Sequence, residues 1–276
     1  MNKQELMDCL ARCGMHPGKV LGQNFLLDGN LLDYIVRTAA PPPGEVVLEV
    51  GPGFGALTAK LLAAGVELYS IEFDHRICEF LRTGLAAPNF HLIEGDACRV
   101  DLRRILPPER EFRAIANLPY AISSVFITRL LDLERPPELM IFMLQKEMGQ
   151  RLAAPAGTKN YGALSVRTQL LYDVKMLRIV SPRVFYPPPG VDSALVCFER
   201  KKALPDLALR RRLGAVARTA FAQRRKQLQK VLCGNFPSEQ VKAAFQVLGL
   251  KPEVRPEALP VETFAALAAQ LSEVRK

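Results

Sequence analysis

The predicted fold depends on one stretch of the chain, Val46-Val47-Leu48-Glu49-Val50-Gly51-Pro52-Gly53-Phe54-Gly55. Its first half is a short apolar run, as expected for a strand that is buried on both faces of a sheet. Its glycines allow a tight turn, and residues 56–64 then have the apolar periodicity of a helix. A strand, a glycine loop and a helix in this order predict a nucleotide-binding hairpin, because a ligand's polar groups can meet the unpaired amides at the helix start.

The glycine loop fits two classes of cofactor. Gly51 and Gly53 have the spacing of the dinucleotide fingerprint, and Glu72 follows about 20 residues later, at the end of the next predicted strand. Two other acidic residues favour S-adenosylmethionine, since Glu49 precedes the first glycine by two positions and Asp96 follows a third predicted strand. The loop alone therefore does not identify the cofactor.

Strand and helix patterns alternate along the first two thirds of the chain. Apolar runs predict strands at 46–50, 67–71, 90–94, 112–116 and 139–144, each followed by helical periodicity. This order predicts a parallel sheet with helices on both faces. Two further apolar stretches, 172–180 and 193–199, have no obvious helix between them and predict an antiparallel hairpin at the edge of the sheet.

A break at residues 201–206 precedes a region with helical patterns only, including 237–248 and 261–274. The predicted fold class is α/β, a Rossmann-like sheet with a smaller all-helical C-terminal domain. We expect the two domains to comprise residues 1–203 and 204–276.

Composition excludes several classes of protein. The 276 residues contain no apolar run near the eighteen or so that cross a bilayer, and the polar start is unlike a secretory signal. A soluble, cytoplasmic protein is expected. The six cysteines form no Cys-x-x-Cys pair, and the three histidines have no ligand spacing, so no metal site is predicted.

The net charge of +9 is concentrated in one segment. Between Arg210 and Lys230 there are eight basic residues and no acidic one. Such a segment favours a polyanionic partner, while a solvated helix face above an apolar stripe is the alternative.

The run Asn117-Leu118-Pro119-Tyr120 follows the predicted strand at 112–116 and suggests chemistry on an amine. The lone pair of a nucleobase amine is delocalised into the ring, and acceptors for its two hydrogens help to free it. The Asn117 amide oxygen and the Leu118 carbonyl are such acceptors, and Tyr120 adds a ring on which a base can stack. An ordinary turn after a strand has the same pattern.

The segment Phe185-Tyr186-Pro187-Pro188-Pro189-Gly190 is rigid and poor in hydrogen-bond donors. It can hold an aromatic ring at the mouth of a site. A stiff connector with a packed Phe185 explains it equally well.

Taken together, these motifs closely resemble one family, the small-subunit ribosomal RNA adenine dimethyltransferases of the KsgA type. The resemblance extends over nearly the whole chain and includes, in order, Gln23 to Leu26, Glu49 to Gly53, Glu72, Asp96, Asn117 to Tyr120, Leu144 to Glu147, the triple-proline loop, and Phe221 to Lys226. The chain departs from the family near its N-terminus, where it has chiefly Lys19 in place of a basic cluster.

The resemblance implies a set of site residues. S-adenosyl-L-methionine would contact Asn24, Leu26, Gly51, Gly53, Glu72, Asp96 and Asn117, with Glu72 on the ribose hydroxyls and Asp96 on the cofactor's adenine. The target adenine would lie between Tyr120 and Phe185, with its amine on Asn117 and Leu118.

The family's product is dimethylated adenine at two adjacent positions near the 3′ end of 16S rRNA, formed during ribosome biogenesis. The implied partner is therefore 16S rRNA within the small (30S) subunit, which Arg224, Arg225 and Lys226 of an RNA-binding C-terminal domain would contact. A monomer without metal or membrane contact is expected.

Several alternatives share parts of this pattern. Large-subunit rRNA methyltransferases that confer macrolide resistance commonly have isoleucine in place of Leu118 and a loop with fewer prolines. DNA adenine and protein glutamine methyltransferases have a second proline at that position. A non-catalytic rRNA-binding assembly factor is the alternative from another class, and the intact cofactor loop argues against binding alone.

Overall fold

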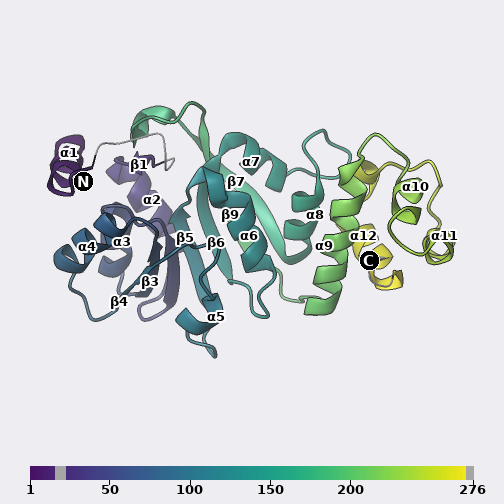
Figure 1. The fold of residues 1–276 in the computed structure, drawn as a ribbon, viewed down its shortest axis with the longest axis horizontal. Helices are drawn as coiled ribbons and strands as arrows, with labels where there is room; N and C mark the ends of the chain where they lie inside the picture. Colours follow the sequence, from purple (N-terminus) through teal and green to yellow (C-terminus); the bar gives the residue numbers. More distant parts are fainter. Residues whose placement is uncertain (16–22, 272–276) are drawn as a thin grey trace. The chain divides into compact units, whose positions relative to one another are not determined.

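The computed structural model describes residues 1–15 and 23–271 (Figure 1). The chain forms two compact units, and each contains segments that are distant in sequence. The first unit comprises Met1–Ile127, Pro137–Lys146 and Met176–Glu199. The second comprises Thr128–Pro136, Glu147–Lys175 and Arg200–Lys276.

A seven-stranded sheet with the order β4-β3-β2-β5-β6-β9-β7 lies at the centre of the first unit (Figure 1). Its strands are β2 (Val46–Val50), β3 (Glu67–Glu72), β4 (Phe90–Glu94), β5 (Phe112–Asn117), β6 (Leu139–Gln145), β7 (Tyr172–Val180) and β9 (Ser193–Arg200). The first five are parallel, whereas β9 runs antiparallel to β6 and β7 lies beside it at the edge. The predicted strands and the parallel sheet are confirmed.

The strand order reverses at β2. Strands β3 and β4 follow on one side of it, and β5 and β6 on the other. In open α/β sheets a ligand site forms where the order reverses, beyond the carboxyl ends of the strands. The glycine loop after β2 and Asn117 at the end of β5 both lie at this place.

Helices cover the sheet, and the burial of its strands explains their composition. Successive residues point to opposite faces. On one face Ile141 and Cys197 belong to a hydrophobic cluster with α2 (Gly29–Ala39) and α3 (Ala56–Ala63). On the other face Phe126 of α6 (Ser123–Leu131) packs against Phe142, which in turn packs against Phe198. Both faces of the central strands are apolar, so these strands read as nearly continuous apolar runs.

Smaller elements complete the first unit beside the sheet. Strands β1 (Phe25–Leu26) and β8 (Phe185–Tyr186) pair antiparallel with Leu26 opposite Phe185. Helix α1 (Lys3–Arg12) packs its buried side against α4 (His75–Gly84) and Phe54. A short helix, α5 (Leu102–Ile105), precedes β5.

The second unit is built from helices around its own hydrophobic cluster. They are α7 (Lys146–Leu152), which begins at the last residue of the first unit, α8 (Ala163–Leu171), α9 (Leu207–Ala222), α10 (Leu228–Cys233), α11 (Ser238–Val247) and α12 (Val261–Gln270). The cluster includes Val166 of α8, Leu213 of α9, Phe245 of α11 and Phe264 of α12. No helix within residues 1–15 and 23–271 is long and apolar enough to cross a membrane.

The boundaries of these two units differ from the single domain boundary between residues 203 and 204 that we expected from the sequence. The helical region after residue 204 has the predicted character, but residues 128–136 and 147–175 belong to the same compact unit. The reason is burial, because Tyr161 and Val166 lie in the hydrophobic cluster of the C-terminal helices. The functions assigned to the two domains stay predictions.

Candidate active site

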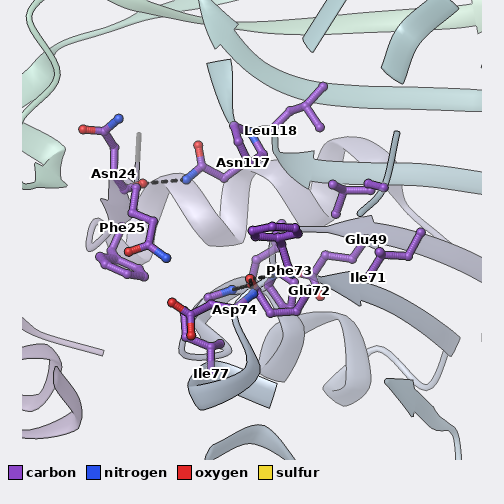
Figure 2. Close-up of a pocket in the computed structure, with 18 of the residues that line it drawn as sticks. Asn24, Phe25, Glu49, Ile71, Glu72, Phe73, Asp74, Ile77, Asn117 and Leu118 are labelled. Carbon is purple, nitrogen blue, oxygen red and sulfur yellow. Dashed lines mark hydrogen bonds between the residues drawn. The ribbon is translucent and has the colours of Figure 1, made fainter. Parts of the chain in front are cut away.

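A cavity of about 510 Å³ lies at the carboxyl ends of β2, β3 and β5, within the first unit (Figure 2). This volume suits a small molecule the size of a nucleoside cofactor. Its lining includes every residue that was predicted to bind the cofactor, namely Asn24, Leu26, Gly51, Gly53, Glu72, Asp96 and Asn117. The structure therefore brings together residues from five separate motifs.

The glycine loop forms one wall, and two of its glycines have conformations that other residues rarely adopt. Gly51 and Gly53 have φ values of +67° and +54°. A Cβ atom on Gly51 would lie 3.2 Å from Pro119, and one on Gly53 would lie 3.1 Å from the Phe25 ring. The glycines thus allow close approach of the loop to its neighbours as well as a left-handed turn.

Glu72 ends β3 with its carboxylate buried and tied to the backbone (Figure 2). Its Oε1 accepts hydrogen bonds from the amides of Phe73 and Asp74 at 2.8 and 2.9 Å, and its Oε2 accepts one from Gly53 at 3.3 Å. Burial raises the pKa of Glu72, and these three amides oppose that shift. The carboxylate has a fixed orientation and retains lone pairs for a ligand's hydroxyl groups.

Glu49 is a second buried carboxyl group in the cavity wall, and it was not predicted as a site residue. Its Oε2 accepts hydrogen bonds from the hydroxyls of Thr58 and Ser70, both at 2.8 Å. Burial raises its pKa to about 7, against the effect of these hydroxyls. The signal was its position two residues before Gly51 at the end of an otherwise apolar strand.

The next part of the wall combines Asp96 with an exposed aromatic ring. Asp96 accepts a hydrogen bond from the amide of Cys98 at 2.8 Å, and its Oδ2 lies 3.4 Å from Arg99 Nε. Phe73, directly after Glu72, lines the cavity with 66% of its surface exposed. Sequence reasoning missed Phe73, although a large apolar residue directly after the carboxylate that ends a strand is a usable signal.

Asn117 ends β5 and is held by the N-terminal motif (Figure 2). Its Nδ2 donates a hydrogen bond to the backbone carbonyl of Asn24 at 2.9 Å. In the described part of the chain neither Asn117 Oδ1 nor the Leu118 carbonyl oxygen accepts a hydrogen bond. Two acceptors are thus left for an incoming amine, and the orientation of one is set by Asn24.

Tyr120 lines the same cavity, and its hydroxyl is engaged with another strand. The Tyr120 hydroxyl and Ser193 Oγ are 2.6 Å apart, and Ser193 is the first residue of β9. Burial raises the pKa of Tyr120, which the hydrogen bond with Ser193 opposes. The phenol is neutral at physiological pH, and the hydrogen bond between its hydroxyl and Ser193 holds the ring in place.

Phe185 does not lie at the cavity. Its ring is 3% exposed and belongs to the hydrophobic cluster of the first unit, and Phe185 is absent from the cavity lining. The physical reason is the β1–β8 pairing, which sets Phe185 opposite the buried Leu26. The structure thus agrees with the alternative interpretation of this segment, a stiff connector with a packed Phe185.

The predicted RNA-contacting residues lie in the second unit, in the turn after α9. Arg225 and Lys226 are exposed. Arg224 instead donates hydrogen bonds to the carbonyls of Thr158 and Lys159. The use of Arg224 inside the protein was not predicted.

Other members of the basic segment also have internal roles. Arg210 is buried and donates to the carbonyls of Leu133 and Glu134 at 2.8 and 3.0 Å. Arg212 donates to the Ala268 carbonyl at 3.3 Å. The segment is therefore partly a set of structural donors rather than a uniform cationic face. Lys19 lies outside the described residues.

The described residues contain no group of three or more His, Cys, Asp or Glu side chains that could hold a metal ion. The chemistry that the cavity can perform rests on two buried carboxyl groups, a cluster of amide and carbonyl acceptors, and aromatic surfaces. This arrangement can bind a nucleoside cofactor and orient an amine.

Comparison with known proteins gives a consistent result. Residues 17–273 match the family described as "Ribosomal RNA adenine dimethylase". A "Ribosomal RNA small subunit methyltransferase A" from Thermosynechococcus vestitus is 39% identical over 94% of this chain and 98% of its own length. A protein of the same name from Leifsonia xyli is 40% identical over 96% of both chains.

Two solved structures are similar over most of the chain. A dimethyladenosine transferase from Plasmodium falciparum has a TM-score of 0.74 and 27% identity, and the match covers 88% of this chain and 95% of that one. The 23S rRNA methyltransferase ErmE has a TM-score of 0.67 and 27% identity, with 90% and 99% covered.

Proposed function

The chain belongs to the ribosomal RNA adenine dimethylase family, and we propose that it dimethylates the N6 amines of two adjacent adenines near the 3′ end of small-subunit (16S) rRNA. The match extends over residues 17–273. The two relatives described above as small-subunit methyltransferases are 39% and 40% identical over nearly the whole of both chains. Both solved structures are 27% identical, and the dimethyladenosine transferase has the higher TM-score, 0.74 against 0.67 for the 23S rRNA methyltransferase. Both observations favour the small-subunit substrate over the large-subunit alternative.

S-adenosyl-L-methionine is the methyl donor and supplies an electrophilic methyl group on a sulfonium that becomes a neutral thioether. The residues of the cavity fit this molecule. The fixed carboxylate of Glu72 suits paired ribose hydroxyls, and Asp96 can accept from an adenine amine. Phe73 offers an exposed ring beside them, and Gly51 allows close approach of the amino-acid portion. Asn24 and Leu26 would line the methionine end.

Asn117 and Leu118 would prepare the amine. An adenine amine that donates one hydrogen to Asn117 Oδ1 and the other to the Leu118 carbonyl is held with its nitrogen lone pair free of both bonds. Since Asn24 already takes Asn117 Nδ2, the amide oxygen is the end that remains for the substrate. This orientation is the single observation that carries the proposed role of Asn117.

The protein need not supply a general base. The nitrogen becomes positively charged as its bond to the methyl carbon forms, and it then loses a proton readily to water. Positioning and hydrogen bonding therefore account for most of the catalysis. Tyr120 would stack on the target base, which must leave any RNA helix to enter the cavity. Phe185 would have to leave the hydrophobic cluster before it could contact the base.

The proposed partner is the small ribosomal subunit. Arg225 and Lys226 are exposed cations suited to phosphate contacts, and Arg224 would contribute by shaping the turn. We place the reaction in ribosome biogenesis, in the cytoplasm, with a monomeric enzyme that uses no metal. A role as an assembly factor is compatible with this activity.

The test is Asn117→Ala, which removes the oriented amide oxygen. Single-turnover methylation should slow by about 10²–10³, the usual cost of one oriented hydrogen-bonding group. Binding of S-adenosylmethionine, measured by calorimetry, should weaken much less. Asn30→Ala, at an exposed position in α2, is the matched control and should behave as wild type. Near-wild-type methylation by Asn117→Ala would reject the assigned role.

A further inference from the structure

The Ser193 hydroxyl is a buried polar group of the first unit to which the proposed reaction assigns no role. Ser193 has 0% of its surface exposed, and its Oγ lies 2.6 Å from the Tyr120 hydroxyl. No other hydrogen bond to either hydroxyl is present in the described part of the chain. The two residues are 73 positions apart in sequence, so this pair connects β9 to the turn after β5.

The position of Ser193 is determined by the sheet. It is the first residue of β9 and lies opposite Gln145, the last residue of β6, in an antiparallel ladder. The preceding residue, Asp192, accepts a backbone hydrogen bond from Lys146 at 3.0 Å. Lys146 Nζ also lies 3.1 Å from Asp192 Oδ2, but both side chains are about 40% exposed and such pairs contribute little. The ladder and the backbone bond therefore fix the Ser193 hydroxyl.

The backbone of Tyr120 is held independently. Tyr120 begins a short 3₁₀ turn, and Ser123 Oγ donates to the Pro119 carbonyl at 3.1 Å. The turn fixes the backbone end of the side chain, and the contact with Ser193 is the hydrogen bond that holds its far end. Tyr120 and Asn117 both line the cavity, so the tilt of the Tyr120 ring sets the plane against which a base would stack.

We propose that Ser193 is a positioning residue that orients the Tyr120 ring, and that this contact is needed more for the second methyl transfer than for the first. The inference rests on the proposed dimethylation. It assigns Ser193 no contact with the substrate. It makes the ratio of dimethylated to monomethylated adenine depend on a hydroxyl outside the predicted set of site residues.

The difference between the two transfers follows from the amine. In each transfer the bond between nitrogen and the methyl carbon forms, the bond between that carbon and sulfur breaks, and one proton leaves the nitrogen for water. The first substrate has two N–H groups, one each for Asn117 Oδ1 and the Leu118 carbonyl. The second has only one N–H group, so one acceptor is left without a partner. Stacking on Tyr120 must then hold the base with one hydrogen bond fewer to the amine.

Loss of the Ser193 hydroxyl should therefore change the products as well as the overall rate. A hydrogen bond of ordinary strength corresponds to roughly a 2- to 12-fold effect on an equilibrium or rate. We expect Ser193→Ala to slow the second transfer by about this factor relative to the first. N6-monomethyladenine should accumulate early in the reaction. S-adenosylmethionine affinity should stay within about twofold of wild type, because the contact lies outside the predicted cofactor-binding set.

The experiment uses the full-length protein, S-adenosylmethionine and small-subunit particles that lack the modification. Nucleosides from timed samples are separated, and the mono- and dimethyladenosine are quantified by mass spectrometry. Tyr120→Phe removes the other half of the pair and should give the same monomethyl accumulation. Ser181→Ala, at an exposed serine that caps a turn, is the matched control and should retain the wild-type ratio. Thermal unfolding of each variant separates loss of fold from loss of positioning.

A double variant decides whether Ser193 acts through Tyr120. With the tyrosine hydroxyl already absent, Ser193→Ala should cause no further change in the product ratio. A wild-type ratio in Ser193→Ala, or an equal additional loss in the Tyr120→Phe background, would overturn this inference and leave the proposed function intact. Wild-type protein that forms no dimethyladenosine would overturn the proposed function and this inference together.

Discussion

Replacing Arg225 and Lys226 together with glutamine should flatten the salt dependence of binding to small-subunit particles. Both side chains are exposed in the turn after α9, and neither has a partner within the described residues. Each cation that neutralises a phosphate contributes roughly 0.7–0.9 to the slope of log affinity against log salt. The double variant should therefore lower the slope by about 1.4–1.8.

Arg224 should respond differently, although it is adjacent in sequence. Its guanidinium donates to the carbonyls of Thr158 and Lys159 and lies 3.9 Å from Glu257. Arg224→Gln should lower the thermal stability of the protein, since it leaves these acceptors without donors. Arg224→Gln should change the salt slope less than the double replacement of Arg225 and Lys226 does.

The assay is equilibrium binding of labelled particles between about 50 and 200 mM salt, a range over which phosphate contacts change affinity strongly. A double variant with glutamine at Lys242 and Lys251, exposed in the same unit, removes the same charge elsewhere and is the matched control. An unchanged slope in the Arg225 and Lys226 variant, or an equal drop in the control, would show that this turn does not contact rRNA.

Three further predictions concern the cofactor cavity and the second unit. Glu72→Ala should raise the dissociation constant of S-adenosylmethionine by the loss of one or two charge-assisted hydrogen bonds of roughly 1.5–3 kcal/mol each, and calorimetry that finds unaltered affinity would reject the ribose contact. The pKa of Glu49 is about 7 in the folded protein, against an ordinary 4.5. Between these two pH values the folded state binds more protons than the unfolded state, so the free energy of unfolding falls as pH rises from about 4.5 through about 7. Glu49→Gln should remove that part of the pH dependence in thermal unfolding without cofactor, and identical pH profiles would contradict the assignment. Arg210→Met should destabilise the protein by about 1–3 kcal/mol in denaturant unfolding, because the partly buried carbonyls of Leu133 and Glu134 lose their donor. Arg211→Met, at the exposed neighbour, should stay within about 0.5 kcal/mol, and equal effects of the two would contradict the structural role of Arg210.

Much of the fold could be predicted from the sequence because its central strands are buried on both faces. Strands of this kind read as apolar runs, and the fully buried strand at 46–50 has the predicted boundaries. The cofactor-binding residues were predictable for a related reason. In a parallel sheet the carboxyl ends of strands meet at one edge, so Glu72 and Asn117 converge although they lie on different strands.

The contacts that could not be predicted join segments far apart in the chain. Phe185 precedes three prolines after Tyr186, and it is buried by its pairing opposite Leu26 and by its packing in the hydrophobic cluster of the first unit. A run of arginines suggests a solvated face, yet Arg210 supplies donors to carbonyls 76 and 77 positions away. No local pattern distinguishes a cation that bonds the protein's own backbone from one that awaits a partner.

The central claim is that this chain dimethylates adenines of small-subunit rRNA. The most direct measurement incubates the protein with methyl-labelled S-adenosylmethionine and, separately, small- and large-subunit particles that lack the modification, and then maps the labelled nucleosides. Label should occur only in small-subunit rRNA, as N6,N6-dimethyladenosine at two adjacent positions near the 3′ end. Label in large-subunit rRNA, or in any nucleoside other than adenosine, would contradict the account.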